Sequence, residues 1–204
     1  MVNTLALDIE TSNYSHEIGG WGNTYLFEPT VVATWDGDNG TVYCNKMDII
    51  SKDLPQYVTI KKLHPRTLGK DLDAHVMGGG QIVGHNIKKF DLPILRDSLD
   101  CWAAGEIMHK SKTLIIDTSS LLRSIIGHPV PLSDVVHHTL GRDKLMNSHD
   151  APFEWRKGQY GKVAKYCLDD AKLSYDLWRH GQTEGLVKAR SRDTGAVTEY
   201  EVNW

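Results

Sequence analysis

Two acidic residues lie two positions apart near the amino terminus, in the segment Leu5-Ala-Leu-Asp8-Ile-Glu10-Thr11. The segment is otherwise apolar, which is typical of a buried β-strand. Strand side chains alternate between two faces, so Asp8 and Glu10 share one face while Leu5, Leu7 and Ile9 share the other. Because neighbouring carboxylates repel each other unless a cation lies between them, this pattern indicates a divalent-metal site. An isolated Asp-x-Glu also occurs where a strand runs into a polar loop, so the remaining motifs must decide.

A second polar cluster follows a short apolar run, in Ile82-Val-Gly-His-Asn86-Ile-Lys-Lys-Phe90-Asp91-Leu-Pro93. The pattern predicts a strand that ends in a polar turn, followed by a helix that begins near Asp91 with Pro93 in its first turn. Taken alone, Asp91 would be interpreted as a helix cap.

A third cluster lies in a long predicted helix, where Tyr166 and Asp170 are four residues apart and therefore on one face. Apolar and small residues fall on or beside this stripe: Val163, Cys167, Ser174 and Leu177. Asp170 is therefore expected to face the core, which is costly unless a partner such as a metal ion compensates the charge. Asp169 and Asp176 fall off the stripe and are expected to be solvated.

The chain has 204 residues, of which 40% are hydrophobic and 24% charged, as expected for one globular domain over 1–204. We expect a core over 1–180, with a hairpin at 186–202 packed on it.

The chain has neither an amino-terminal leader pattern nor an apolar stretch near the roughly 20 residues of a membrane span, which favours a cytoplasmic protein. Three scattered cysteines, Cys44, Cys101 and Cys167, are expected to be reduced core residues. The net charge of −3 argues against a generally basic surface, although bound divalent ions would add local positive charge.

The apolar periodicity predicts an α/β fold, with an antiparallel meander first and parallel strands later in a mixed sheet flanked by helices. Strands are expected at Leu5–Thr11, Val31–Trp35, Thr41–Cys44, Gln81–His85 and Thr113–Asp117. Helices are expected at Thr67–Met77, Asp91–Trp102, Thr118–Ile126, Leu132–Leu140 and Gly158–His180. Asp36–Gly40 and Asp193–Gly195 are turn signals of two hairpins, the second within Leu186–Val202. Gly78–Gly80 lacks the Lys-Ser/Thr of a phosphate-binding loop and is interpreted as a helix stop.

Asp-x-Glu, Asn-x-x-x-Phe-Asp and Tyr-x-x-x-Asp, in this order and structural context, resemble the DEDD superfamily of 3′-to-5′ exonucleases, on its tyrosine-containing (DEDDy) branch. A histidine-type member would carry His four or five residues before the last Asp, where this chain has Lys165 and Tyr166. The resemblance runs from Thr4 to about His180 and implies an RNase H-like fold. The segment from Leu132 through the tail is similar to exonuclease domains attached to predicted bacterial helicases. No motif is found between Tyr14 and Pro65.

The resemblance implies two Mg²⁺ or Mn²⁺ ions roughly 4 Å apart, which would drive an in-line displacement. Asp8, Glu10 and Asp170 would hold one ion, with Asp8 bridging to a second ion held by Asp91. Tyr166 would orient the attacking water, since a phenol of pKa near 10 is a poor base. Substrate contacts are expected at the 3′ hydroxyl and the terminal nucleotide, from Glu10, Thr11, Asn86 and Phe90.

The expected activity is release of nucleoside 5′-monophosphates from single-stranded 3′ ends, DNA being the first candidate. The same chemistry on RNA is the alternative, because sugar choice depends on contacts to the 2′ position. A catalytically silent nucleic-acid-binding domain is a third hypothesis, although it predicts loss of a ligand and none is lost. A polymerase or helicase acting in trans is a candidate partner, and no membrane partner is expected.

We expect structural or surface roles for several further polar residues, and for others the role is open. His137 and His138 point about 100° apart on a helix, and we expect surface or interface roles for them. Asp117 is interpreted as a helix cap. For the following residues a role in binding nucleic acid and a structural role are both open: Tyr14, Trp21, Lys88, Lys89 and Arg96.

Overall fold

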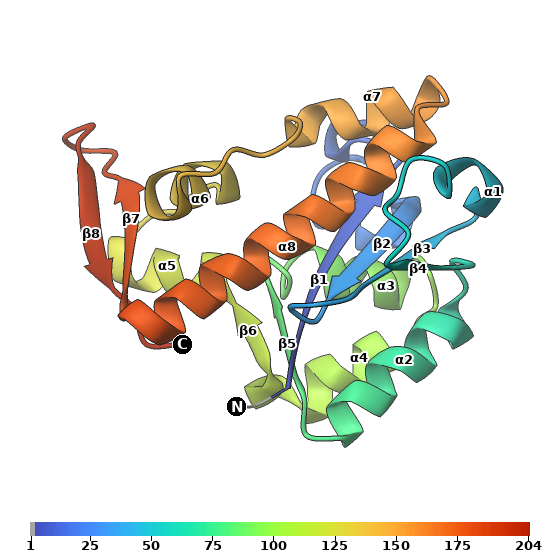
Figure 1. Cartoon of the computed structure of the whole chain (residues 1–204), viewed down its shortest axis with the longest axis horizontal. Coiled ribbons are helices and arrows are strands. Elements are labelled where there is room, and N and C mark those ends of the chain that lie inside the picture. The colour runs from blue at the N-terminus through green and yellow to red at the C-terminus, as the bar shows by residue number, and fades with distance from the viewer. Residues whose placement is uncertain (1–2) are drawn as a thin grey trace.

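The computed structural model describes residues 3–204 and places a six-stranded sheet between two layers of helices (Figure 1). The strands, in sheet order, are β4 (Val58–Lys61), β3 (Gly40–Cys44), β2 (Pro29–Trp35), β1 (Thr4–Thr11), β5 (Gln81–Gly84) and β6 (Ile115–Asp117). β1, β2 and β3 pair antiparallel, whereas β4, β5 and β6 each pair parallel with a neighbour. The predicted α/β mixed sheet with a terminal hairpin is therefore confirmed.

One long helix covers one face of the sheet and three shorter helices cover the other (Figure 1). The long helix is α8 (Tyr160–Glu184), and the opposite layer contains α2 (Pro65–Met77), α3 (Asp91–Asp97) and α4 (Trp102–Lys110). The other short helices are α1 (Met47–Ile50), α5 (Thr118–Ile126), α6 (Leu132–Leu140), α7 (Ala151–Arg156), η1 (Ser15–Ile18), η2 (Thr24–Leu26), η3 (Lys112–Leu114) and η4 (Ser148–Asp150). Within residues 3–204, none of the helices combines the length and apolar character that a membrane crossing requires.

Strand alternation decides which residues of β1 face α8. Leu7 and Ile9 belong to the core between the sheet and α2, α3 and α4. Ala6 belongs to the opposite core, with Val163 and Cys167 of α8. Asp8 and Glu10, two and four residues after Ala6, therefore point to the α8 side of the sheet.

The carboxyl-terminal hairpin packs against helices beside the sheet. It consists of β7 (Leu186–Arg190) and β8 (Val197–Glu201), which pair antiparallel. Val187 and Ala189 of β7 share a buried cluster with Val136 of α6 and Leu177 of α8. The Trp204 indole donates a hydrogen bond to the carbonyl of Trp178 in α8 over 2.9 Å, which ties the tail to this helix.

The helix predicted over Asp91–Trp102 is wrong in its extent, because α3 covers only the first 7 residues of that range. α3 ends at Asp97, and the chain turns before α4 begins at Trp102. Asp100 has a φ of +53°, a left-handed conformation that interrupts a right-handed helix. The elements β4, α1, α4 and α7 were not predicted, and α8 continues four residues beyond the predicted end at His180. α2 ends at Met77, directly before the glycine stop.

Candidate metal centre

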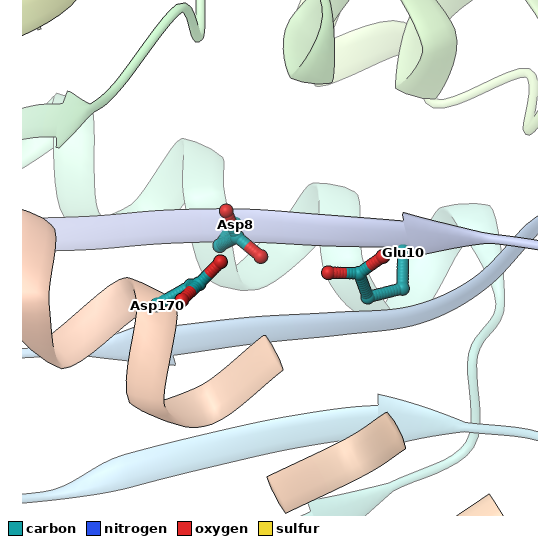
Figure 2. Close-up of side chains that lie close together, drawn as sticks. All are labelled: Asp8, Glu10 and Asp170. Carbon is teal, nitrogen blue, oxygen red and sulfur yellow. The ribbon is translucent and has the colours of Figure 1, made fainter. Parts of the chain in front are cut away.

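Three carboxylates from two elements meet on the α8 side of the sheet. Asp8 and Glu10 come from β1 and Asp170 from α8, and one oxygen of each lies within 4.8 Å of the others. Figure 2 shows the Asp8 and Asp170 carboxylates directed at each other, with the Glu10 carboxylate turned toward them from farther along β1. An all-oxygen set of this kind suits a hard divalent cation.

Several buried oxygens in this cluster lack hydrogen-bond partners. Within residues 3–204, no protein group hydrogen-bonds to Asp8 Oδ2, Asp170 Oδ1 or the Tyr166 hydroxyl. Tyr166 and Asp170 are only 1% and 3% exposed. Buried polar atoms in folded proteins are nearly always partnered, so these oxygens are suited to a bound cation and its waters. The cluster of Asp8, Glu10 and Asp170 could therefore hold a metal ion.

Asp91 reaches the same region from α3, where β5 stops pairing with β1. The β1–β5 register extends only to Ala6 and Val83, and β5 ends at Gly84. Beyond that point the backbone N–H of Ile9 donates to Asp91 Oδ1 over 3.1 Å. Phe90, not Asp91, is the N-cap residue of α3. Asp91 therefore connects α3 to β1, directly beside Asp8, although it lies outside the close trio.

The loop between β5 and α3 is fixed by a buried acid. Asp117, 1% exposed, accepts backbone N–H groups of Asn86 at 3.0 Å, Lys88 at 3.1 Å and Ser120 at 3.0 Å. The bond from Ser120 makes Asp117 the N-cap of α5, as predicted, and the other two hold the loop in place. Asn86 has a φ of +74°, a conformation that Asn adopts more readily than most residues.

A partly buried histidine, His85, also holds this loop. His85 Nδ1 lies 3.0 Å from the Thr118 hydroxyl, and its Nε2 lies 2.8 Å from the carbonyl oxygen of Val130. Burial lowers the pKa of His85 to about 4, so its ring is neutral at pH 7. The adjacent Gly84 admits no side chain, because a Cβ there would lie 2.9 Å from the Leu7 carbonyl oxygen.

The acidic cluster opens into a cleft of about 340 Å³. The cleft is lined by every residue predicted to bind metal, react or contact substrate: Asp8, Glu10, Thr11, Asn86, Phe90, Asp91, Tyr166 and Asp170. The register of β1 with β2 shifts between Glu10 and Thr11, which turns the end of β1 at the cleft. The Thr11 hydroxyl donates to the carbonyl of Asn13 over 3.0 Å. Residues distant in the sequence thus share one solvent-accessible space.

Aromatic side chains form one wall of the cleft. Phe90 packs edge-on against Trp21 and against Phe27, with ring centroids 5.5 Å apart in both pairs. Trp21 is nevertheless 62% exposed. Tyr14 stacks on His16 in the loop after β1 and lies beneath Arg156. Trp21 therefore packs within the wall and also presents aromatic surface to the cleft.

Burial and mutual repulsion raise the pKa values of the acidic groups in the cluster. Burial, with the negative charge of Asp170, raises the pKa of Asp8 and of Glu10 well above the ordinary values. Burial raises the pKa of Asp91 to about 8. The pKa of Tyr166 is also raised, by burial and then by the charge of Asp170. A divalent cation would favour the ionised carboxylates, because it neutralises the repulsion.

Lys144 is a functional candidate that the sequence patterns did not indicate. Its ammonium lies 2.6 Å from Asp170 Oδ2, in the irregular segment between α6 and α7. Burial raises the pKa of Asp170, and the positive charge of Lys144 opposes that rise. A lysine in a segment without periodicity carries no signal that would separate it from surface lysines.

The remaining predicted polar residues make contacts elsewhere. On α8, Asp169 and Asp176 are partly exposed and both pair with Arg142, at 3.6 Å and 2.5 Å. His137 contacts Asp143 and His138 contacts Asp134, at the α6 surface. Arg96 pairs with Asp97, Lys88 and Lys89 are exposed, and the three cysteines are buried free thiols, as expected.

The raised pKa of Asp91 predicts how the stability of the metal-free protein depends on pH. Between the ordinary value of 3.8 and about 8, the folded protein retains a proton that the unfolded chain loses. Stability should therefore fall as pH rises through this window. In EDTA we expect the Tm to drop between pH 5 and pH 8 by at least about 2–4 °C, the effect of roughly 1 kcal/mol.

Asp91→Asn should make this slope shallower, because Asn keeps an acceptor for the Ile9 N–H and does not titrate. The raised pKa values of Asp8 and Glu10 should account for the slope that remains. Asp176→Asn, on a partly exposed acid of α8 outside the cleft, should leave the slope unchanged. Thermal unfolding followed by circular dichroism measures both variants, and an Asp91→Asn slope equal to that of the wild type would contradict the assignment.

Comparison of the chain with protein families yields no matching family model, and comparison with curated proteins yields no significant match. The residues and geometry of the cleft are therefore the basis for inferring a function.

Proposed function

We propose that this protein is a divalent-metal-dependent 3′-to-5′ exonuclease that acts on single-stranded ends, DNA being the first candidate substrate. The observation that carries the proposal is the placement of four carboxylates and Tyr166 around one cleft, with three carboxylate oxygens within 4.8 Å. These residues come from three separate sequence motifs, and nothing local in the chain requires the motifs to meet.

The donor set fits hard divalent cations, since it offers oxygen ligands with unpartnered atoms at Asp8 and Asp170. Asp8, Glu10 and Asp170 would hold one Mg²⁺ or Mn²⁺, and Asp8 with Asp91 would hold a second. When bound, such ions activate a water for attack on a phosphodiester and stabilise the departing 3′ oxygen. The protein's own contribution is to fix these carboxylates on β1, α3 and α8.

Tyr166 is suited to orient the attacking water. It lies one helical turn before Asp170 on α8, and its buried hydroxyl lacks a hydrogen-bond partner within the described chain, 3–204. Its raised pKa keeps the hydroxyl protonated, so Tyr166 can donate a hydrogen bond but does not act as the base that takes the water's proton. The water would then lose its proton to another group or to solvent.

The cleft walls offer contacts to a terminal nucleotide. Trp21 and Phe90 present aromatic surface on which a base could stack, a contact that tolerates any base. Glu10 and the backbone of Thr11 would contact the 3′ hydroxyl, and Asn86 lines the same cleft. Recognition of a free 3′ hydroxyl would restrict cleavage to chain ends and release nucleoside 5′-monophosphates.

The same residues support cleavage of RNA, so an exoribonuclease is the alternative. A non-catalytic binding domain would have no need of Asp8, Glu10, Asp91, Tyr166 and Asp170 together. A polymerase or helicase in trans remains a proposed partner, and location in the cytoplasm a prediction.

Incubation of the purified protein with 5′-labelled single-stranded DNA and RNA tests the activity. With Mg²⁺ or Mn²⁺ we expect a ladder that shortens from the 3′ end, and no degradation in EDTA. An oligonucleotide with a 3′ phosphate should resist degradation, because it lacks the free 3′ hydroxyl that the site is proposed to recognise. Asp170→Asn should strongly slow the shortening, whereas Asp176→Asn, on the same helix, should retain the wild-type rate. A wild-type rate in Asp170→Asn, or degradation in EDTA, would refute the proposed site.

A further inference from the structure

Lys144 is placed as an internal counter-ion of the acidic cluster. Its ammonium lies 2.6 Å from Asp170 Oδ2 and 4.9 Å from the centroid of the Tyr166 ring. The Lys144 side chain is 14% exposed and that of Asp170 is 4% exposed. Of the ion pairs found within residues 3–204, this one has the most buried acid. Such a pair is stronger than an exposed one.

The ion pair uses only half of the Asp170 carboxylate. Oδ2 is bound to Lys144, while Oδ1 is buried and has no hydrogen-bond partner among the described residues. A cation that binds Oδ1 would share this carboxylate with the ammonium. Because like charges repel, Lys144 opposes the binding of a metal ion to Asp170.

Lys144 can also reach a substrate phosphate. It lines the same cleft as the acidic residues and Phe90. It comes from an irregular segment, Gly141 to Asn147, in which the neighbouring Asp143 and Leu145 are exposed. A lysine side chain has four flexible methylenes, so its ammonium can move from one anion to another without movement of the backbone.

The net charge of the proposed centre with both metal ions bound favours movement of the Lys144 ammonium from Asp170 to a phosphate. Four ionised carboxylates and two divalent cations cancel, and the Lys144 ammonium then leaves one positive charge. A phosphodiester carries one negative charge, which matches it. A phosphate in the cleft is therefore a better partner for Lys144 than an Asp170 that already binds metal.

We propose that Lys144 couples metal binding to nucleic-acid binding, by partnering Asp170 in the free protein and the substrate phosphate in the complex. The inference rests on the proposed metal site. Without a nucleotide, Lys144 weakens metal binding at Asp170. A phosphate that draws the Lys144 ammonium away from Asp170 therefore strengthens metal binding. By linkage, a bound metal strengthens phosphate binding by the same factor.

Mn²⁺ titrations followed by electron paramagnetic resonance test the coupling in the wild type, K144M and K144R. The anionic probe is thymidine 5′-monophosphate, and thymidine is its uncharged control. We expect K144M to bind Mn²⁺ at least about fivefold tighter than the wild type in the absence of nucleotide, the lower end of typical coupling. Thymidine 5′-monophosphate should tighten Mn²⁺ binding to the wild type and K144R. The factor by which thymidine 5′-monophosphate tightens Mn²⁺ binding should be at least about fivefold smaller in K144M than in the wild type.

Further variants separate this inference from the proposed function. K165M removes an exposed lysine of α8 and should behave as the wild type. Asp8→Asn should weaken Mn²⁺ binding, which places the ion in the cleft. If Mn²⁺ binding depends on Asp8 but K144M binds it no tighter, or keeps the full coupling, the role of Lys144 is overturned and the exonuclease proposal stands. If no Mn²⁺ binding depends on Asp8, both are overturned.

Discussion

Asp8→Ala should cause the largest loss of exonuclease activity of any single substitution in the cleft. Asp8 is central in position, because it lies close to Glu10 and Asp170 and is also next to Ile9, whose N–H binds Asp91. In the proposed site it is the ligand common to both ions. Loss of residues that merely support metal ligands costs about 10- to 100-fold, so loss of this ligand should cost at least about 100-fold.

The prediction is measured as the rate of 3′-end shortening at saturating Mn²⁺, for Asp8→Ala beside Asp8→Asn. The Asn variant keeps the volume and removes the charge, so it separates ligand loss from a packing defect. Asp38→Asn, on an exposed acid of the β2–β3 turn, is the matched control and should retain full rate. A smaller loss for Asp8→Ala than for Asp170→Ala would show that Asp8 is not the shared ligand.

Tyr166→Phe should slow the reaction without weakening metal binding. The hydroxyl has no hydrogen-bond partner within residues 3–204, so its removal leaves no group of the described chain unpaired. We expect a decrease of about 10- to 100-fold, below the upper range of a general base, with Mn²⁺ affinity within about twofold of the wild type. The pH dependence of the rate should keep its shape, because Tyr166 does not exchange the proton.

Single-turnover rates and Mn²⁺ titrations test this prediction together. Tyr160→Phe, on a tyrosine at the start of α8 that packs on Trp155 outside the cleft, is the matched control. An unchanged rate in Tyr166→Phe would remove the tyrosine from the mechanism. A large loss of Mn²⁺ affinity would instead make it a support of the metal centre.

Regular periodicity predicted the elements that carry the acidic trio. Alternation along β1 placed Asp8 and Glu10 on the face opposite Leu7 and Ile9, and the helical repeat directed Asp170 inward. Both signals are local, because they depend only on how neighbouring residues project from a regular backbone. The mixed sheet and the terminal hairpin followed from the same kind of signal.

Irregular segments were predicted less well. The break between α3 and α4 depends on the left-handed conformation of Asp100, and the short strand β4 is held by parallel pairing with β3. The pairing partner lies outside the strand's own sequence. Neither feature has a period that a sequence pattern could reveal.

The sequence by itself determined which acidic side chains leave β1 and α8 toward the core, since strand and helix geometry fixes their directions. The tertiary structure alone decided that Asp91 binds the Ile9 N–H, that Asp117 holds the loop before it, and that Lys144 reaches Asp170. These contacts join residues that are 82, 31 and 26 positions apart in the sequence. Only packing of the whole chain brings such groups together, because no backbone repeat relates them.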